Sequence, residues 1–101
     1  MMLLTKALRQ RLPQLYAQDG DPHAKAYVKF FTPDGAATWY VSEFDGVDTC
    51  FGWADLGLGP GCAELGYFSL SEIEALRGPL GLPVERDRGF RPTRLTALIA
   101  A

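Results

Sequence analysis

The spacing of apolar residues predicts a helix close to the start of the chain. Leu8, Leu12 and Leu15 repeat at i, i+4 and i+7, which places them on one helical face, and Thr5 is a suitable N-cap. Pro13 interrupts this pattern, because proline cannot take part in the hydrogen bonding of a helix interior. Two outcomes stay open: the helix kinks at Leu12, or Pro13 begins a separate turn.

A second predicted helix follows residue 69 and has stronger sequence signals. Ser69 and Glu72 match the S-x-x-E capping box, which satisfies free backbone amides at the start of a helix. Leu70, Ile73 and Leu76 then recur at a spacing of three. This helix is therefore expected to pack on a sheet and to end before the Gly-Pro pair that follows.

Between the two helices, runs of β-forming residues predict an antiparallel meander. The four runs cover residues 26–31, 38–44, 49–56 and 63–69. The pair Asp45-Gly46 is a strong hairpin signal, and strands joined by turns this short must pair antiparallel. After the second helix we expect a short extended piece at Val84 to Asp87 and a terminal helix from about Thr93.

These elements predict an α+β fold in which residues 1–101 form a single domain. Its centre is a four-stranded antiparallel meander sheet, with an N-terminal helix and a C-terminal capped helix in a two-layer arrangement. The side chains expected to alternate along the second strand are Trp39 and Val41 on one side and Tyr40 and Phe44 on the other. Because both sides are apolar, the second is covered either by the C-terminal segment or by another protein chain, such as a second copy forming a homodimer.

The composition is that of an ordinary globular protein, with 48% apolar and 22% charged residues. No run approaches the roughly 18 apolar residues of a membrane span, so no membrane interaction is expected. The first residues lack the features of a signal peptide. Cys50 and Cys62 have no metal-ligand spacing and are expected to be reduced thiols. We therefore expect a cytoplasmic protein.

Charge is distributed unevenly along the chain. The net charge is −2, but no lysine or arginine lies between Lys29 and Arg77, and that interval holds eight acids. The flanking segments hold all ten basic residues and only four acids. Either the acidic interval attracts a basic partner, or its acids lie on a solvent-facing sheet and are balanced by basic helices nearby.

The residue patterns identify no catalytic or metal site. His23 is the only histidine, and no serine or cysteine has a spacing that suggests a nucleophilic triad with it. Glu43, Asp45 and Asp48 do not follow the order of an EF-hand loop, and the glycine-rich loops do not match a phosphate-binding loop. We expect no metal, no cofactor and no catalytic residue.

A basic cluster lies close to the C-terminus. Its members are Arg86, Arg88, Arg91 and Arg94. Arginines in such a cluster can contact the phosphates of a nucleic acid. Glu85 and Asp87 lie among them, however, and pairing of the cluster with the acidic sheet is the favoured interpretation. No direct nucleic-acid binding is therefore expected.

The acids of the meander are the main candidate for a partner-binding surface. Asp45 and Asp48 are first of all turn residues, and Asp48 is expected to accept a hydrogen bond from a backbone amide of the turn. Glu43, Asp55 and Glu64 have no evident local structural role. Carboxylates attract a basic surface, and aromatic side chains between them supply buried anchors. The predicted partner-binding residues are Glu43, Asp45, Asp48, Phe51, Trp53, Asp55 and Glu64.

Several segments together resemble a small bacterial family of unknown function, number 2958 in the domain-of-unknown-function series. They are LLTKALRQRLPQLYA (3–17), AYVKFFTPDGAATWYVSEFDG (26–46) and ELGYFSLSEIEALRGPLGLPVERD (64–87), followed by Phe90. The resemblance spans nearly the whole chain and brings no established activity or catalytic residue. It implies a genomic context, because similar proteins are often encoded on plasmids, phages and integrated conjugative elements, beside anti-restriction and partitioning genes.

The expected function is that of a small non-enzymatic accessory protein of a mobile genetic element. It would bind a protein partner with a basic surface, such as a CRISPR or restriction complex of the host that handles nucleic acid. The alternative is a small enzyme or ligand-binding domain that uses Asp19, Asp21 and His23 together with Glu85-Arg86-Asp87. Direct DNA binding through the C-terminal arginines is the least favoured hypothesis.

Overall fold

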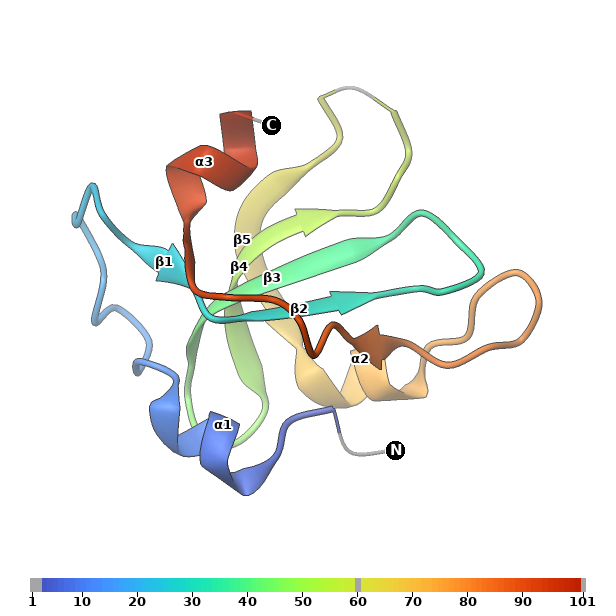
Figure 1. Cartoon of the computed structure of the whole chain (residues 1–101), viewed down its shortest axis with the longest axis horizontal. Coiled ribbons are helices and arrows are strands. Elements are labelled where there is room, and N and C mark those ends of the chain that lie inside the picture. Colours follow the sequence, from blue (N-terminus) through green and yellow to red (C-terminus); the bar gives the residue numbers. More distant parts are fainter. Residues whose placement is uncertain (1–2, 60, 101) are drawn as a thin grey trace.

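The computed structural model describes residues 3–59 and 61–100, with an antiparallel sheet at the centre and short helices at its two ends (Figure 1). Met1, Met2, Pro60 and Ala101 lie outside the described residues. One residue of the glycine-rich loop at 57–62, and the first two residues and the last residue of the predicted domain, therefore lie outside them.

The two capped helices begin at the predicted residues. In α1 (Lys6–Arg11), the Thr5 hydroxyl accepts a hydrogen bond from the Leu8 amide at 3.2 Å. In α2 (Leu70–Ala75), the Ser69 hydroxyl accepts one from the Glu72 amide at 3.3 Å. A third helix, α3 (Leu95–Ala100), follows close to the position predicted for a terminal helix.

Helix α1 stops at Leu12 and does not kink there. Leu12 is the C-cap and has extended backbone angles, φ −68° and ψ 132°. The residue before a proline is driven out of the helical region by the proline ring, so Pro13 explains this ending. The question that the sequence left open is thereby settled: a run of turns follows α1.

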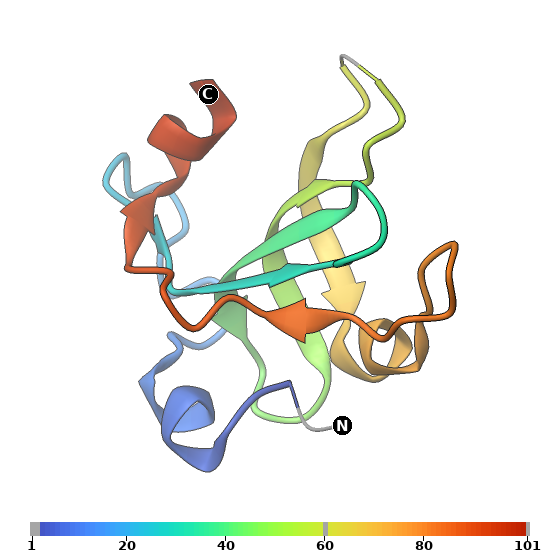
Figure 2. The ribbon, with the colours of Figure 1, turned by 45° about the vertical axis from the view of Figure 1, so that its right-hand side comes forward.

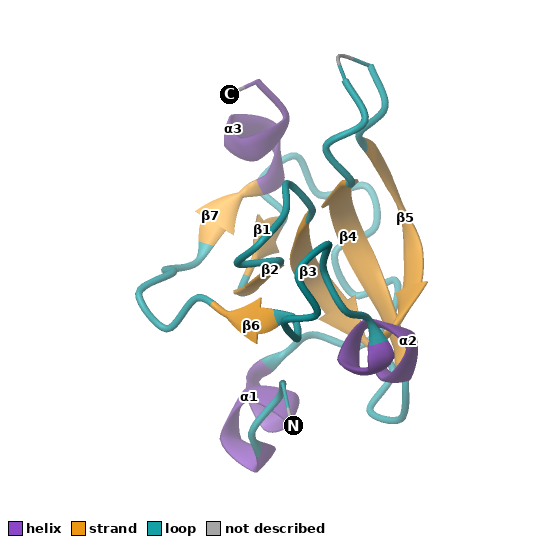
Figure 3. Ribbon diagram, turned by 90° about the vertical axis from the view of Figure 1, so that its right-hand side faces the viewer, coloured by secondary structure: helices purple, strands orange, loops and turns teal. Residues whose placement is uncertain are grey.

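The main sheet has five strands, so the prediction of four was wrong in number although the antiparallel α+β class is confirmed. The strands are β2 (Val28–Phe31), β3 (Thr38–Phe44), β4 (Thr49–Asp55), β5 (Glu64–Ser69) and β6 (Glu85–Arg86). Their order is β5-β4-β3-β2-β6, as Figures 2 and 3 show from two sides. Strand β6 comes from the piece predicted only as extended, and it covers the free edge of β2 by pairing Phe30 with Arg86.

A second, two-stranded sheet joins β1 (Lys25–Ala26) to β7 (Thr93–Arg94). The predicted first strand, residues 26–31, is thus divided at Tyr27: its first residue pairs with the C-terminal segment, and the rest joins the main sheet. This short ladder ties the segment before β2 to the start of α3.

A β-bulge changes the sides on which the residues of β3 lie. The register between β3 and β4 shifts between Val41, opposite Gly52, and Glu43, opposite Phe51. The extra residue, Ser42, reverses the alternation beyond it. Phe44 therefore packs in the same core as Val41, and the prediction that it lies with Tyr40 was wrong.

The core occupies one side of the sheet, between the strands and the segments that contain α1 and α2. Its buried members are Leu3, Leu4, Leu12, Val28, Phe30, Trp39, Val41, Phe44, Cys50, Leu70, Ile73 and Val84. The other side is partly covered by the C-terminal segment, where the Phe90 ring lies 5.7 Å from the Tyr40 ring. Helices α1 and α2 lie at one end of the sheet and α3 at the other (Figure 3).

Candidate functional site

The second side of the sheet carries a row of large side chains that the core does not use. In the register of β4 and β5, Phe51 lies opposite Tyr67 and Trp53 opposite Leu65. The rings of Phe51 and Tyr67 are 5.1 Å apart and inclined at 58°. Cross-strand aromatic pairs of this kind stabilise a sheet, but 56% of Tyr67 and 45% of Leu65 remain exposed.

Glu43 fixes the loop after α1 beside this row. Its Oε1 accepts a hydrogen bond from the Tyr16 amide at 2.8 Å, and its Oε2 accepts one from the Gln18 amide at 2.7 Å. Only 5% of Glu43 is exposed. The expectation that it has no structural role was wrong, because both carboxylate oxygens satisfy backbone amides that would otherwise be buried without partners.

The Gln18 side chain completes this attachment of the loop. Its Nε2 donates to the Ser42 hydroxyl at 2.8 Å and to the Lys25 carbonyl at 3.1 Å, and its Oε1 accepts from the Lys25 amide at 2.9 Å. Tyr16 has a left-handed backbone conformation, φ 70°, which is uncommon for a residue with a side chain. The loop is held by specific contacts, and 67% of Tyr16 is exposed.

Loop and sheet together enclose a hollow of about 340 Å³. We call it the aromatic–acidic groove, and the name covers Tyr16, Asp19, Asp21, Phe51, Leu65 and Tyr67. A hydrogen bond to Tyr16, assisted by partial burial and by the nearby charges of Glu43 and Asp19, raises the pKa of Tyr67. The Tyr67 hydroxyl therefore stays protonated near neutral pH and is available as a hydrogen-bond donor or acceptor.

The charges at the groove are negative. No lysine or arginine is among the described residues that line it. Asp19 and Asp21 are exposed; one oxygen of Asp21 accepts from the His23 amide at 2.8 Å, and no described residue bonds the Asp19 carboxylate. Lys25 and Arg94 lie on the neighbouring β1–β7 ladder. The groove is thus a local acidic site beside basic residues.

Trp53 and Asp55 lie on the same side of the sheet but in a neighbouring hollow. It has a volume of about 340 Å³ and is closed by α3, through Leu98 and Ile99, and by the loop between β4 and β5. Asp55 also accepts a hydrogen bond from the Gly57 amide at 2.9 Å. Of the seven predicted partner-binding residues, Phe51 and Glu43 line the groove, and Trp53 and Asp55 line this second hollow.

The remaining three predicted residues lie away from both hollows. Asp45 Oδ1 accepts hydrogen bonds from the amides of Val47, Asp48 and Thr49, and these bonds lower the pKa of Asp45. It is therefore a turn residue, as predicted. Glu64 is exposed and pairs across the strands with Ala54, on the opposite side of the sheet from Phe51 and Trp53.

Asp48 bonds to a different element from the one predicted. Its carboxylate accepts hydrogen bonds from the Ser69 hydroxyl at 2.5 Å and from the Ser71 amide at 2.7 Å. These bonds, that of Ser69 first, lower the pKa of Asp48. The expected partner was an amide of its own turn, so this interpretation was wrong: Asp48 joins the β3–β4 hairpin to the start of α2.

A match to a family model identifies the family of the chain. The model described as "Protein of unknown function (DUF2958)" matches residues 3–101. The chain belongs to this family. No curated protein and no solved structure matches it. Membership of DUF2958 confirms the resemblance noted from the sequence and assigns no role to the groove.

The structure of this DUF2958 member separates the groups considered for catalysis. His23 lines neither of the two hollows described above, and Cys50 is buried, which raises the pKa of its thiol to about 12. Among residues 3–59 and 61–100, no group of three or more possible metal ligands is found. Within the same ranges, no helix is long and apolar enough to cross a membrane.

The C-terminal arginines are not paired with the acidic sheet, so that prediction was wrong. The one ion pair within the described part of the chain joins Lys29 to Asp87 at 3.9 Å. Arg86 donates instead to the Leu3 carbonyl at 2.6 Å. The acids of β3 and β4, Glu43 and Asp55, instead accept hydrogen bonds from backbone amides.

Proposed function

We propose that this protein acts without catalysis, by binding a basic segment of a partner protein in the aromatic–acidic groove. The observation that carries the proposal is the exposure of Tyr16 and Tyr67, 67% and 56%, directly beside acids. Aromatic side chains left exposed next to a hollow are typical of protein-binding surfaces.

The chemistry of the groove supports a basic occupant. A lysine or arginine that enters it approaches the carboxylates of Asp19 and Asp21 and the faces of tyrosine and phenylalanine rings. Carboxylates provide charge pairing, and aromatic faces add a cation–π attraction. The groove is about the size of one or two side chains, so we propose that a single basic residue with its neighbours is the anchor.

Family context supports a more specific partner. Since the resemblance implies genes on mobile elements, we propose a cytoplasmic accessory protein that blocks the basic nucleic-acid-binding surface of a host CRISPR or restriction complex. The acids that carry this role differ from those expected from the sequence. Asp19 and Asp21 replace Glu43, Asp45 and Asp48, whose carboxylates hold the fold together.

Charge reversal with a matched control tests the proposal. The variant Asp19→Lys/Asp21→Lys reverses the charge of two acids in the groove. The control Glu64→Lys/Glu72→Lys makes the same change in net charge at exposed residues outside the groove. Proteins captured from a host lysate by the wild type are identified, purified and titrated calorimetrically against all three proteins. We expect the groove variant to bind at least about tenfold more weakly and the control to bind like the wild type.

Two outcomes would overturn this function. In one, every purified candidate binds both variants as tightly as the wild type, so that the groove is not the interface. In the other, the control loses as much affinity as the groove variant, so that only net charge matters. Thermal unfolding of each variant checks that the fold is intact before binding is compared.

The alternative site built from Asp19, Asp21 and His23 with Glu85-Arg86-Asp87 is not brought together. Asp19 and Asp21 line the groove, whereas Arg86 and Asp87 line a separate cavity beside α1. His23 lines neither of these.

A further inference from the structure

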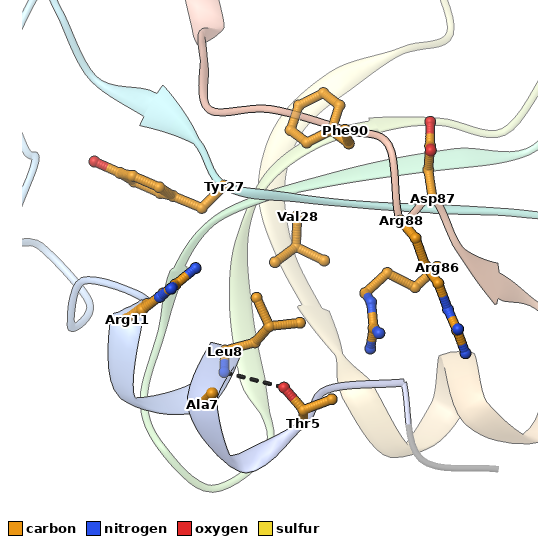
Figure 4. A pocket seen from close by; sticks show the side chains of 10 residues that line it. All are labelled: Thr5, Ala7, Leu8, Arg11, Tyr27, Val28, Arg86, Asp87, Arg88 and Phe90. Carbon is orange, nitrogen blue, oxygen red and sulfur yellow. Dashed lines mark hydrogen bonds between the residues drawn. The ribbon is translucent and has the colours of Figure 1, made fainter.

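A third cavity, of about 360 Å³, lies between α1 and the segment that follows β6 (Figure 4). Its apolar floor is formed by Leu8 and Val28, and the aromatic side chains of Tyr27 and Phe90 border it. Strand β6 pairs with β2 at Phe30 and Phe31, and just beyond them the Asp87 amide still donates to the Lys29 carbonyl at 2.9 Å; the cavity opens between this part of the chain and α1. The cavity shares no lining residue with the aromatic–acidic groove.

Three guanidinium groups surround the apolar floor. Arg11 comes from the end of α1, and Arg86 and Arg88 come from the opposite wall (Figure 4). Arg11 and Arg88 are exposed, and neither has an ion-pair or hydrogen-bond partner among the described residues. Because the two walls are far apart in sequence, the fold itself gathers these positive charges.

The one acid in the lining does not cancel them. Asp87 faces Lys29, whose Nζ lies 3.9 Å from Oδ2, and its Oδ1 accepts a hydrogen bond from the Gly89 amide at 2.9 Å. Lys29 and the Gly89 amide therefore offset part of its charge, and the three arginines outnumber this one acid in the lining. Arg86 donates one N–H to the Leu3 carbonyl, which fixes the guanidinium at the wall and leaves its other N–H groups available.

From this combination we infer that the cavity binds a nucleoside phosphate. Arginine donates pairs of parallel N–H bonds that fit phosphate oxygens, and three arginines around one opening match the charge of a phosphate ester. The aromatic side chains and the apolar floor fit a flat base, and the volume lies within the range of small-ligand sites. A base next to arginines and aromatic rings is held by stacking as well as by charge.

Calorimetric titration of the full chain tests the inference with AMP, adenosine, inorganic phosphate and a short 5′-phosphorylated single-stranded oligonucleotide. We expect AMP to bind and adenosine to bind at least about tenfold more weakly, because the phosphate contacts are lost. Inorganic phosphate lacks the base and is expected to bind more weakly than AMP. If the oligonucleotide binds through the same arginines and AMP does not, the phosphate belongs to a nucleic-acid strand end.

The variant Arg11→Ala/Arg88→Ala removes two exposed arginines whose side chains make no hydrogen bond or ion pair with the described residues, and thermal unfolding checks that the variant is folded. We expect it to weaken AMP binding at least about tenfold. The matched control is Arg91→Ala/Arg94→Ala, which removes the same charge at exposed residues that do not line the cavity. The inference is overturned if neither AMP nor the oligonucleotide binds, or if both double variants weaken binding equally. Binding of the protein partner in the groove is a separate measurement, so failure of one proposal leaves the other standing.

Discussion

Glu43 shows why the role of a single residue was hard to predict. Its carboxylate oxygens accept hydrogen bonds from the amides of Tyr16 and Gln18, which precede it by 27 and 25 residues. Every residue except proline carries a backbone amide, so the partners of such a carboxylate leave no pattern in the sequence. Asp45 differs, because its three amides follow within four residues and the Asp-Gly pair marks the turn.

Replacing Glu43 with glutamine should destabilise the protein. The new NH₂ group cannot accept a hydrogen bond, so one buried backbone amide loses its partner. We expect Glu43→Gln to lower the free energy of unfolding by about 1–3 kcal/mol, the usual cost of a buried donor left unsatisfied. Urea denaturation measures this, with Glu64→Gln as the control, since Glu64 is exposed and no described residue bonds its side chain. Equal stability of the two variants would contradict the structural role of Glu43.

At the scale of elements, the sequence correctly predicted those features that depend on contacts between residues close together in the chain. The caps of α1 and α2 and the β3–β4 turn depend on residues within four positions of one another, and all three were correctly placed. Strand β6 has two residues and exists because the edge of β2 needs a partner. The bulge at Ser42 likewise depends on the pairing of β3 with β4. The side of the sheet on which Phe44 lies could therefore not be derived from the alternation of residues along β3 alone.

Two glycines that face each other across β4 and β5, Gly52 and Gly66, differ in what they permit. A Cβ at Gly52 would lie 1.8 Å from the Tyr40 carbonyl oxygen, whereas a Cβ at Gly66 would meet nothing within 4 Å. Gly52→Ala must therefore push β3 and β4 apart beside the bulge, and we expect it to lower the free energy of unfolding by about 2 kcal/mol or more. Gly66→Ala is the matched control and should change it by about 0.5 kcal/mol or less. Similar losses in both variants would mean that the close approach at Gly52 is not a constraint.

At the scale of the whole molecule, the candidate site could be predicted only in part. The aromatic residues of β4 were found because Phe51 and Trp53 alternate with small residues in a run of β-formers. Tyr16, Asp19 and Asp21 come from a loop whose position depends on Glu43, and Tyr67 comes from the next strand. The groove exists only when these separate segments are assembled, and the same is true of the arginine-lined cavity.

The start of the described chain connects segments that lie far apart in sequence. The Leu3 amide donates to Glu74 Oε2 at 3.0 Å, and the Leu3 carbonyl accepts from Arg86. Leu4, beside it, is fully buried in the core. These contacts tie α2 and β6 to one core, so we expect the chain to unfold as one cooperative unit.

Leu4→Ala tests this cooperativity, because it leaves a cavity where the segments meet. We expect it to lower the free energy of unfolding by about 2–5 kcal/mol. Trp39 lies in the core and Trp53 on the other side of the sheet, so Trp39→Phe and Trp53→Phe each leave one fluorescent probe on a different side. Leu4→Ala is combined with each tryptophan variant, and unfolding in urea is followed by fluorescence and by far-ultraviolet circular dichroism. In both combinations, the two signals should give the same, lowered urea midpoint of unfolding. If Leu4→Ala lowers the unfolding midpoint reported by Trp39 fluorescence but leaves the midpoint reported by Trp53 fluorescence unchanged, the side carrying the groove unfolds independently of the core.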